Sequence, residues 1–322
     1  MKRAFYILIN KKMILREQHM LPHKIKLKHM KIYVISLILC WTNLIYSQTL
    51  NTEITNQGTP FLLGKINKEG LISTNYNTWF SKEFNNYKPN KEIIQKNSKN
   101  LKEYTITLFM GTWCGDSRRE VPRFYKILET SNYPMKQLTA IAVSGKSDMY
   151  KQSPNREEKG LNIHRVPIFI FYKNGVEVNR IVESPVISLE EDIQNILENN
   201  YEPNYKVVAK VDKMLQNFGV KKFSRKVKKE IPRFKTEIKS MYELNTYAHI
   251  LKSTNRIEEA IEVLKLNTEL FPKKPRVFVN LANTFYSLDN KEEALVNYEK
   301  GLKLNPDNEK LKATIQRIET EL

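Results

Sequence analysis

The chemistry of this chain of 322 residues centres on a single cysteine in the run Trp113–Ser117, which reads WCGDS. The residues before it, Tyr104–Met110, are β-branched and aromatic, which is typical of a buried strand. Residues 117–129 carry apolar side chains at helical spacing, so we expect a helix there. Cys114 would then lie at a helix start, where free backbone N–H groups and the helix dipole favour a thiolate. The pattern therefore indicates a nucleophilic thiol.

A second landmark lies about fifty residues downstream of Cys114. There Val166-Pro167 leads directly into the apolar run Ile168–Tyr172, which a turn over 173–175 joins to a second candidate strand over 176–183. A proline that opens a strand, followed by a turn containing glycine, predicts a hairpin.

Together the two landmarks resemble the thioredoxin superfamily. WCGDS matches the WCxxC turn of that family except at its last position, and Val166-Pro167 matches its cis-proline site. The resemblance covers roughly residues 57–201 and implies an α/β domain in which helices flank a central mixed sheet. It also implies that Val166 and Pro167 lie beside Cys114 and that Pro167 positions the backbone of a substrate.

The same resemblance assigns roles around the turn. Trp113 would shield the sulfur, and Gly115 and Asp116 would contact substrate together with Val166. Ser117 stands where the family has its resolving cysteine, and a hydroxyl cannot release a mixed disulfide, although it can hydrogen-bond a thiolate. Leu108 stands where thioredoxins carry a buried acid that assists the resolving thiol. These two departures predict a monothiol rather than an ordinary dithiol cycle.

The other cysteine, Cys40, lies in the uncharged run 32–46. This run is short for a membrane span. Lys31 before it and Ser47 after it give the pattern of a secretory signal peptide over about 30–47, with Met30 as a candidate start. The sequence thus predicts export to the periplasm or cell envelope, and a membrane anchor over 32–46 is the alternative. If cleavage occurs, Cys114 is the only thiol of the mature chain.

The net charge of +18 comes almost entirely from two segments, 1–31 and 206–239. The second segment is predicted to be helical, with interruptions at Gly219 and Pro232. A basic amphipathic helix can bind weakly to an anionic membrane surface. We favour a connector with a solvated lysine face, and nothing in the pattern indicates nucleic-acid binding.

The C-terminal region repeats with a period of 34 residues, so that Ala248 recurs as Ala282 and Pro272 as Pro306. This period resembles tetratricopeptide repeats. Helices are expected near 244–253, 257–270, 277–288 and 291–304, with a capping helix over 309–319. Because two repeats are few for independent stability, the basic helix upstream and the terminal helix should complete the stack. Such repeats imply a protein or peptide partner, and the alternative is that they only stabilise or dimerise the chain.

The predicted organisation is an N-terminal extension (1–48), a thioredoxin-like domain (49–202), a basic connector (203–240), two repeats (241–308) and a capping helix (309–322). A hairpin is expected within 60–72 and a helix over 77–87. His164 is expected to face solvent, and the alternative places it beside the Cys114 thiolate. The histidines lack the spacing of metal ligands, and no metal or other cofactor is indicated.

Two functions are compatible with this pattern. In the first, Cys114 forms mixed disulfides with a substrate protein or a small thiol, and an external thiol resolves them, as in a monothiol thiol–disulfide oxidoreductase. In the second, the chain is a redox-inert binding module of the cell envelope.

Overall fold

The computed structural model describes residues 49–322. The predicted signal peptide or anchor and Cys40 lie outside the described residues. Residues Leu50–Leu322 form one compact unit. Within 49–322, no helix is both long enough and apolar enough to cross a bilayer.

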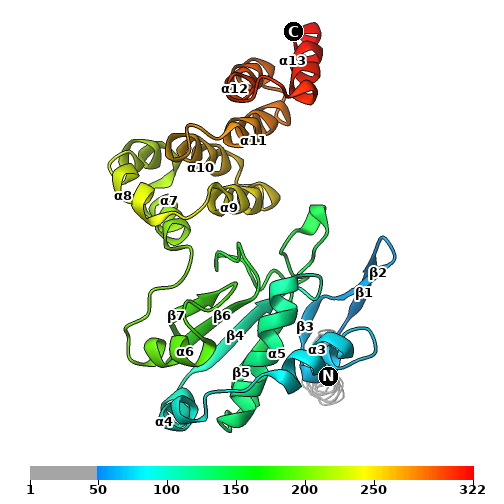
Figure 1. Cartoon of the computed structure of the whole chain (residues 1–322), viewed down its shortest axis with the longest axis vertical. Helices are drawn as coiled ribbons and strands as arrows, with labels where there is room; N and C mark the ends of the chain where they lie inside the picture. Colours follow the sequence, from blue (N-terminus) through cyan, green and yellow to red (C-terminus); the bar gives the residue numbers. More distant parts are fainter. Residues whose placement is uncertain (1–48) are drawn as a thin grey trace, which may run out of the picture. The chain divides into compact units, whose positions relative to one another are not determined.

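The first part of this unit is built on a five-stranded mixed sheet with the strand order β3-β5-β4-β6-β7 (Figure 1). The strands are β3 (Gly64–Ile66), β4 (Thr105–Met110), β5 (Leu138–Ala142), β6 (Ile168–Lys173) and β7 (Val176–Val182). Strands β4 and β5 run parallel, and the other neighbours are antiparallel. A separate hairpin joins β1 (Glu53–Asn56) to β2 (Thr59–Leu62). The strand predicted before the WCGDS run is β4, and the two strands predicted after Pro167 are β6 and β7, so these predictions are confirmed.

The helices of this part pack against one face of the sheet. They are α2 (Lys68–Leu71), α3 (Asn77–Asn86), α4 (Lys91–Leu101), α5 (Gly115–Thr130) and α6 (Leu189–Leu197), with short 3-10 turns η1 (Met135–Gln137) and η2 (Ser147–Met149). Leu108 and Met110 of β4 share a buried cluster with Phe124 of α5. Phe109 points to the other face, where Val166 of the loop before β6 packs. A mixed sheet with helices, followed by a helical region, confirms the expected fold class.

The hairpin predicted within residues 60–72 is wrong. Asn67 begins α2 instead, because its side chain accepts a hydrogen bond from the Gly70 N–H at the helix N-terminus. The preceding strand β3 pairs with β5 rather than with the residues after Gly70. The hairpin that does form turns at Gln57 and Gly58, both of which have positive φ. The helix expected over 77–87 is present as α3.

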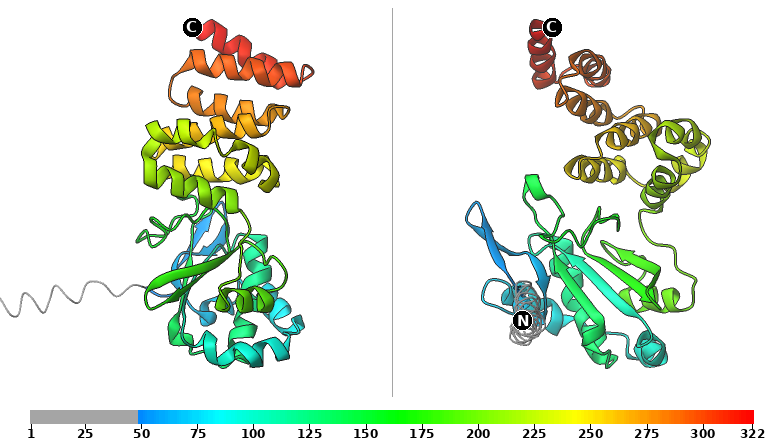
Figure 2. Two further views of the ribbon diagram at one scale, coloured as in Figure 1. Left: turned by 90° about the vertical axis from the view of Figure 1, so that its left-hand side faces the viewer. Right: turned by 180° about the vertical axis from the view of Figure 1, so that it is seen from behind.

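The second part is entirely helical and stacks its helices in sequence (Figure 2). Its elements are α7 (Lys206–Val227), α8 (Ile231–Glu237), α9 (Met241–Ser253), α10 (Ile257–Leu270), α11 (Pro275–Tyr286), α12 (Lys291–Leu304) and α13 (Glu309–Glu321). The repeat alanines Ala248 and Ala282 are buried where helices meet. Phe223 of α7 and Ile318 of α13 belong to the same buried cluster, so both flanking helices complete the stack as expected.

The basic segment is helical, as predicted. Gly219 leaves the helical region of backbone space at φ 64° and kinks α7. Pro232 differs from its predicted role, because it lies in the first turn of α8 and starts a helix rather than interrupting one. Five cations, including Lys213 and Lys229, line a groove of about 400 Å³ between α7 and α8. Contact of this segment with a membrane surface stays a prediction.

Candidate active site

Cys114 occupies the N-cap position of α5, directly after the loop that follows β4. Its N–H donates to the Gly111 carbonyl at 2.9 Å, and its own carbonyl accepts from the Arg118 N–H at 3.0 Å. The side chain makes no capping hydrogen bond and is partly exposed. The thiol therefore lies at the positive end of a helix of 16 residues and does not cap it.

The loop before β6 lies against this sulfur. The Cys114 thiol donates to the Val166 carbonyl oxygen, with Sγ and O 3.3 Å apart. The peptide bond between Val166 and Pro167 is cis. Residues separated by about fifty positions are thus brought together, in the arrangement that the resemblance implies for Cys114, Val166 and Pro167.

Trp113 is held in a slot between two glycines. Its Nε1–H donates to the Val143 carbonyl at 2.9 Å. A Cβ atom at Gly111 would lie 2.5 Å from the indole ring, and one at Gly145 would lie 3.0 Å from it. Both positions therefore need glycine because the Trp113 ring packs directly on their Cα atoms, and neither has a positive φ. The indole forms a fixed wall next to the cysteine.

The remaining residues of the turn have partners of their own. Ser117 is fully buried, and its hydroxyl accepts from the Gly111 N–H at 3.2 Å. Asp116 forms an ion pair with Arg119 at 2.8 Å, and Gly115 is exposed. A hydrogen bond from Ser117 to the thiolate, and substrate contacts of Gly115 and Asp116, stay predictions.

His164 does not face solvent, so that expectation is wrong. The ring is only 4 % exposed and lies between the aromatic rings of Tyr205 and Tyr247, 5.7 and 6.3 Å away. Its Nδ1 lies 3.1 Å from the Asn162 carbonyl. Burial lowers the pKa of His164 to about 3, so the ring is neutral at pH 7. It cannot supply the positive charge that would stabilise a neighbouring thiolate.

A cation near the sulfur comes instead from Lys151, which sequence reasoning missed. Its ammonium group is buried and donates to the His164 carbonyl at 2.6 Å, two residues before the carbonyl that the Cys114 thiol contacts. Burial lowers the pKa of Lys151 to about 8, and the negative charge of Cys114 acts in the opposite direction. No periodic pattern in the loop between β5 and β6 singles this lysine out.

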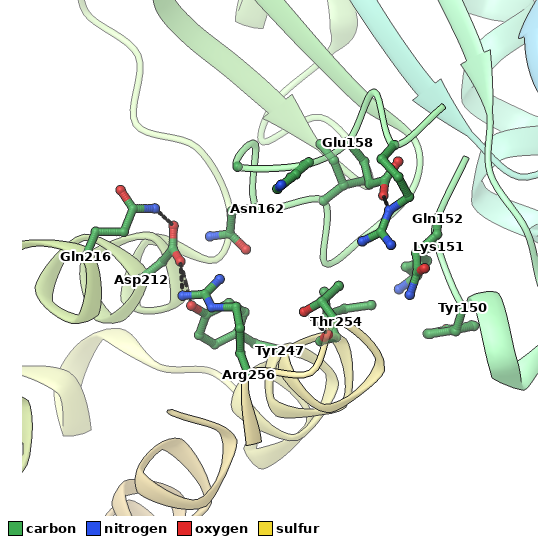
Figure 3. A pocket seen from close by; sticks show the side chains of 15 residues that line it. Tyr150, Lys151, Gln152, Glu158, Asn162, Asp212, Gln216, Tyr247, Thr254 and Arg256 are labelled. Carbon is green, nitrogen blue, oxygen red and sulfur yellow. Dashed lines mark hydrogen bonds and ion pairs between the residues drawn. The ribbon is translucent and has the colours of Figure 1, made fainter. Parts of the chain in front are cut away.

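Lys151 also lines a cavity of about 270 Å³ between this loop, helices α7 and α9 and the turn before α10. Its lining side chains are drawn in Figure 3. Asp212 is its most buried carboxylate, and burial raises the pKa of this group. The carboxylate accepts from the Tyr247 hydroxyl at 2.6 Å and from Gln216 at 2.8 Å, and the Arg256 guanidinium lies 3.8 Å away. Because these polar groups satisfy one another, they hold the helices together rather than marking a ligand site.

Comparison with known proteins gives one family match. Residues 275–308 match the tetratricopeptide repeat family, which coincides with the second predicted repeat. No curated protein matches the chain. The C-terminal helices thus include a tetratricopeptide repeat, which indicates a protein-binding module.

Proposed function

We propose that the chain is an exported thioredoxin-family protein in which Cys114 is a reactive monothiol. The Cys114 thiolate attacks one sulfur of a substrate disulfide, so that a new S–S bond forms and the other substrate sulfur leaves as a thiolate that takes a proton from solvent. An external thiol then attacks the mixed disulfide, which frees Cys114 and leaves the substrate joined to that thiol. No second sulfur of this domain is required.

The observation that carries this proposal is the position of the sulfur. Cys114 lies at the N-terminus of α5, partly exposed and against the cis Val166-Pro167 bond. The Val166 carbonyl accepts a hydrogen bond from the sulfur, and the helix start and the buried Lys151 ammonium place positive charge in the site. A sulfur that leaves this carbonyl on ionisation would be free to attack a disulfide placed beside Pro167.

A redox-inert binding module is the second candidate. The repeat over 275–308 favours it, because such repeats bind proteins whatever the chemistry of a neighbouring domain. Ser117 fits it too, since the turn lacks a resolving thiol. Under this function, a Cys114→Ala variant would keep its partners and its phenotype.

The test uses the full chain with Cys40→Ser as background and 2,2′-dithiodipyridine as the disulfide. We expect one thiopyridone per chain, a stable mixed disulfide, and no reaction of the Cys114→Ala variant. The folded protein should react at pH 7 faster than the same chain unfolded in urea. Lys151→Met should slow the folded protein about fivefold, by removing a charge that favours thiolate, and Lys159→Met, at an exposed position of the same loop, should not.

Equal rates for the folded and unfolded chains would show that the fold does not activate Cys114, and the inert module would then be the better function. If the folded chain reacts faster, disulfide-linked partners captured on Cys114 in the intact envelope would identify the substrate.

A further inference from the structure

A polar groove lies next to the candidate active site. It has a volume of about 330 Å³ and is formed by one face of α9, one face of α11 and the ring of Tyr150 from the loop after η2. Asn245 and His249 are four residues apart on α9, and Arg276 and Asn280 are four residues apart on α11. Side chains at this spacing share a helix face, so each helix turns two polar groups to the groove.

The groove is connected to Cys114 through contacts on both sides. The Tyr150 ring lies 5.8 Å from the ring of Trp113 and 4.9 Å from that of His249. Arg165, the neighbour of Val166, donates to the carbonyl of Tyr242 at 3.4 Å. The two ring-to-ring distances add up to about 11 Å, so the Trp113 and His249 rings are at most that far apart, which an extended peptide covers in no more than roughly three or four residues.

The charged and polar side chains of the groove indicate what kind of segment it can bind. Arg276 lies over the Tyr242 ring at 5.6 Å and forms no ion pair within residues 49–322. No acidic side chain lines the groove. In the same described range, the buried Nδ2 of Asn245 has no hydrogen-bond partner, and the Asn280 side chain also lines the groove. The unpaired Nδ2 donor matches the C=O of a peptide backbone, and a guanidinium without an ion-pair partner matches a carboxylate.

We propose that this groove and Cys114 form one substrate site, in which an extended acidic segment of a protein substrate lies along α9 and α11 and brings its disulfide to Cys114. The inference rests on the proposed thiol chemistry and names its substrate class. Charge argues against the chain's own N-terminal segment as occupant, because residues 1–31 carry nine Lys and Arg against the single acid Glu17. A basic segment would be repelled by Arg276.

The experiment uses the full chain and two probe peptides, each with one cysteine activated as a thiopyridyl disulfide. One peptide carries two aspartates three and four residues from the cysteine, and the other carries lysines at the same positions. The rate of thiopyridone release is measured for both and for 2,2′-dithiodipyridine. We expect the acidic peptide to react about fivefold faster than the basic one, which is the effect of one exposed ion pair.

Two arginine variants test the assignment. Arg276→Gln should bring the ratio of the two peptide rates close to one, because it removes the guanidinium that pairs with the substrate carboxylate. Arg317→Gln is the matched control, because Arg317 also lies over a tyrosine ring, that of Tyr286 at 5.5 Å, but outside the groove. The ratio of the acidic-peptide rate to the basic-peptide rate should be the same in Arg317→Gln as in the wild type.

An unchanged ratio in Arg276→Gln, or a preference for the basic peptide, would overturn the inference while leaving the proposed function intact. A shift of oligomeric state in that variant would also overturn it, since a second copy would then be the occupant. Absence of any reaction with dithiodipyridine would instead contradict the proposed function itself.

Discussion

At the scale of single residues, the fold places Cys114 against the cis Val166-Pro167 bond. Cys114, Val166 and Pro167 could be placed together because two short motifs carry them at a specific separation. Lys151 and Tyr150 lie in a loop without periodicity, and only the folded chain shows that Lys151 donates to the His164 carbonyl and that Tyr150 packs near Trp113. A loop residue is positioned by the tertiary contacts of its neighbours, which leave no local trace in the sequence.

His164 gives a prediction about pH. Its pKa is about 3 in the folded protein, against an ordinary value near 6.5, because burial disfavours the charged ring. Between these values the unfolded chain binds a proton that the folded chain does not, so stability should fall as the pH is lowered from about 6.5. His164→Gln should remove a dependence of about 1.4 kcal/mol per pH unit.

Urea unfolding at several pH values between 4 and 7 measures this slope, and NMR titration of the ring reports the protonation directly. A ring that titrates near 6.5 in the folded protein would show that His164 is not enclosed in solution.

At the scale of elements, helices were easier to predict than the short strands before the WCGDS run. The 34-residue period repeats each helical signal twice, so α9 to α12 were expected almost at their observed bounds. The segment 60–72 carries turn residues that suit either a hairpin or a helix start. The side chain of Asn67, which caps α2, decided between them.

Gly301 tests the packing of the repeat. It lies in α12, where an added Cβ would be 3.1 Å from Val279 and 3.3 Å from the Pro275 carbonyl of α11. Gly301→Val should therefore force the two helices apart and lower the free energy of unfolding by about 2 kcal/mol. Lys300→Val is the control, because it places the same β-branched residue on the exposed side of α12. Equal losses in the two variants would assign the effect to helix propensity instead of packing.

At the scale of the whole molecule, the sequence predicted two kinds of domain but not the contacts that join them. Within Leu50–Leu322, the Gln152 side chain donates to the Ser253 carbonyl of α9 at 2.8 Å. His164 also lies against Tyr247 of that helix. Contacts between distant segments depend on how two surfaces fit, and neither periodicity nor a short motif encodes that fit.

These contacts predict that the described residues unfold as one cooperative unit. Trp79 and Trp113, the two tryptophans among residues 49–322, both belong to the sheet part, so their fluorescence reports on that part. Far-UV circular dichroism is dominated by the helical part. In urea the two signals should change together in the wild type.

Gln152→Ala should shift both transitions to lower urea, by about 1 kcal/mol, because it removes the hydrogen bond to the partly buried Ser253 carbonyl. Asn155→Ala, at an exposed position of the same loop, should leave them in place. Two separate transitions in the wild type would mean that the sheet and the repeats fold independently. The groove lined by α9, α11 and Tyr150 would then be lost whenever the repeats unfold on their own. At urea concentrations that unfold only the repeats, the acidic peptide should no longer react faster than the basic one.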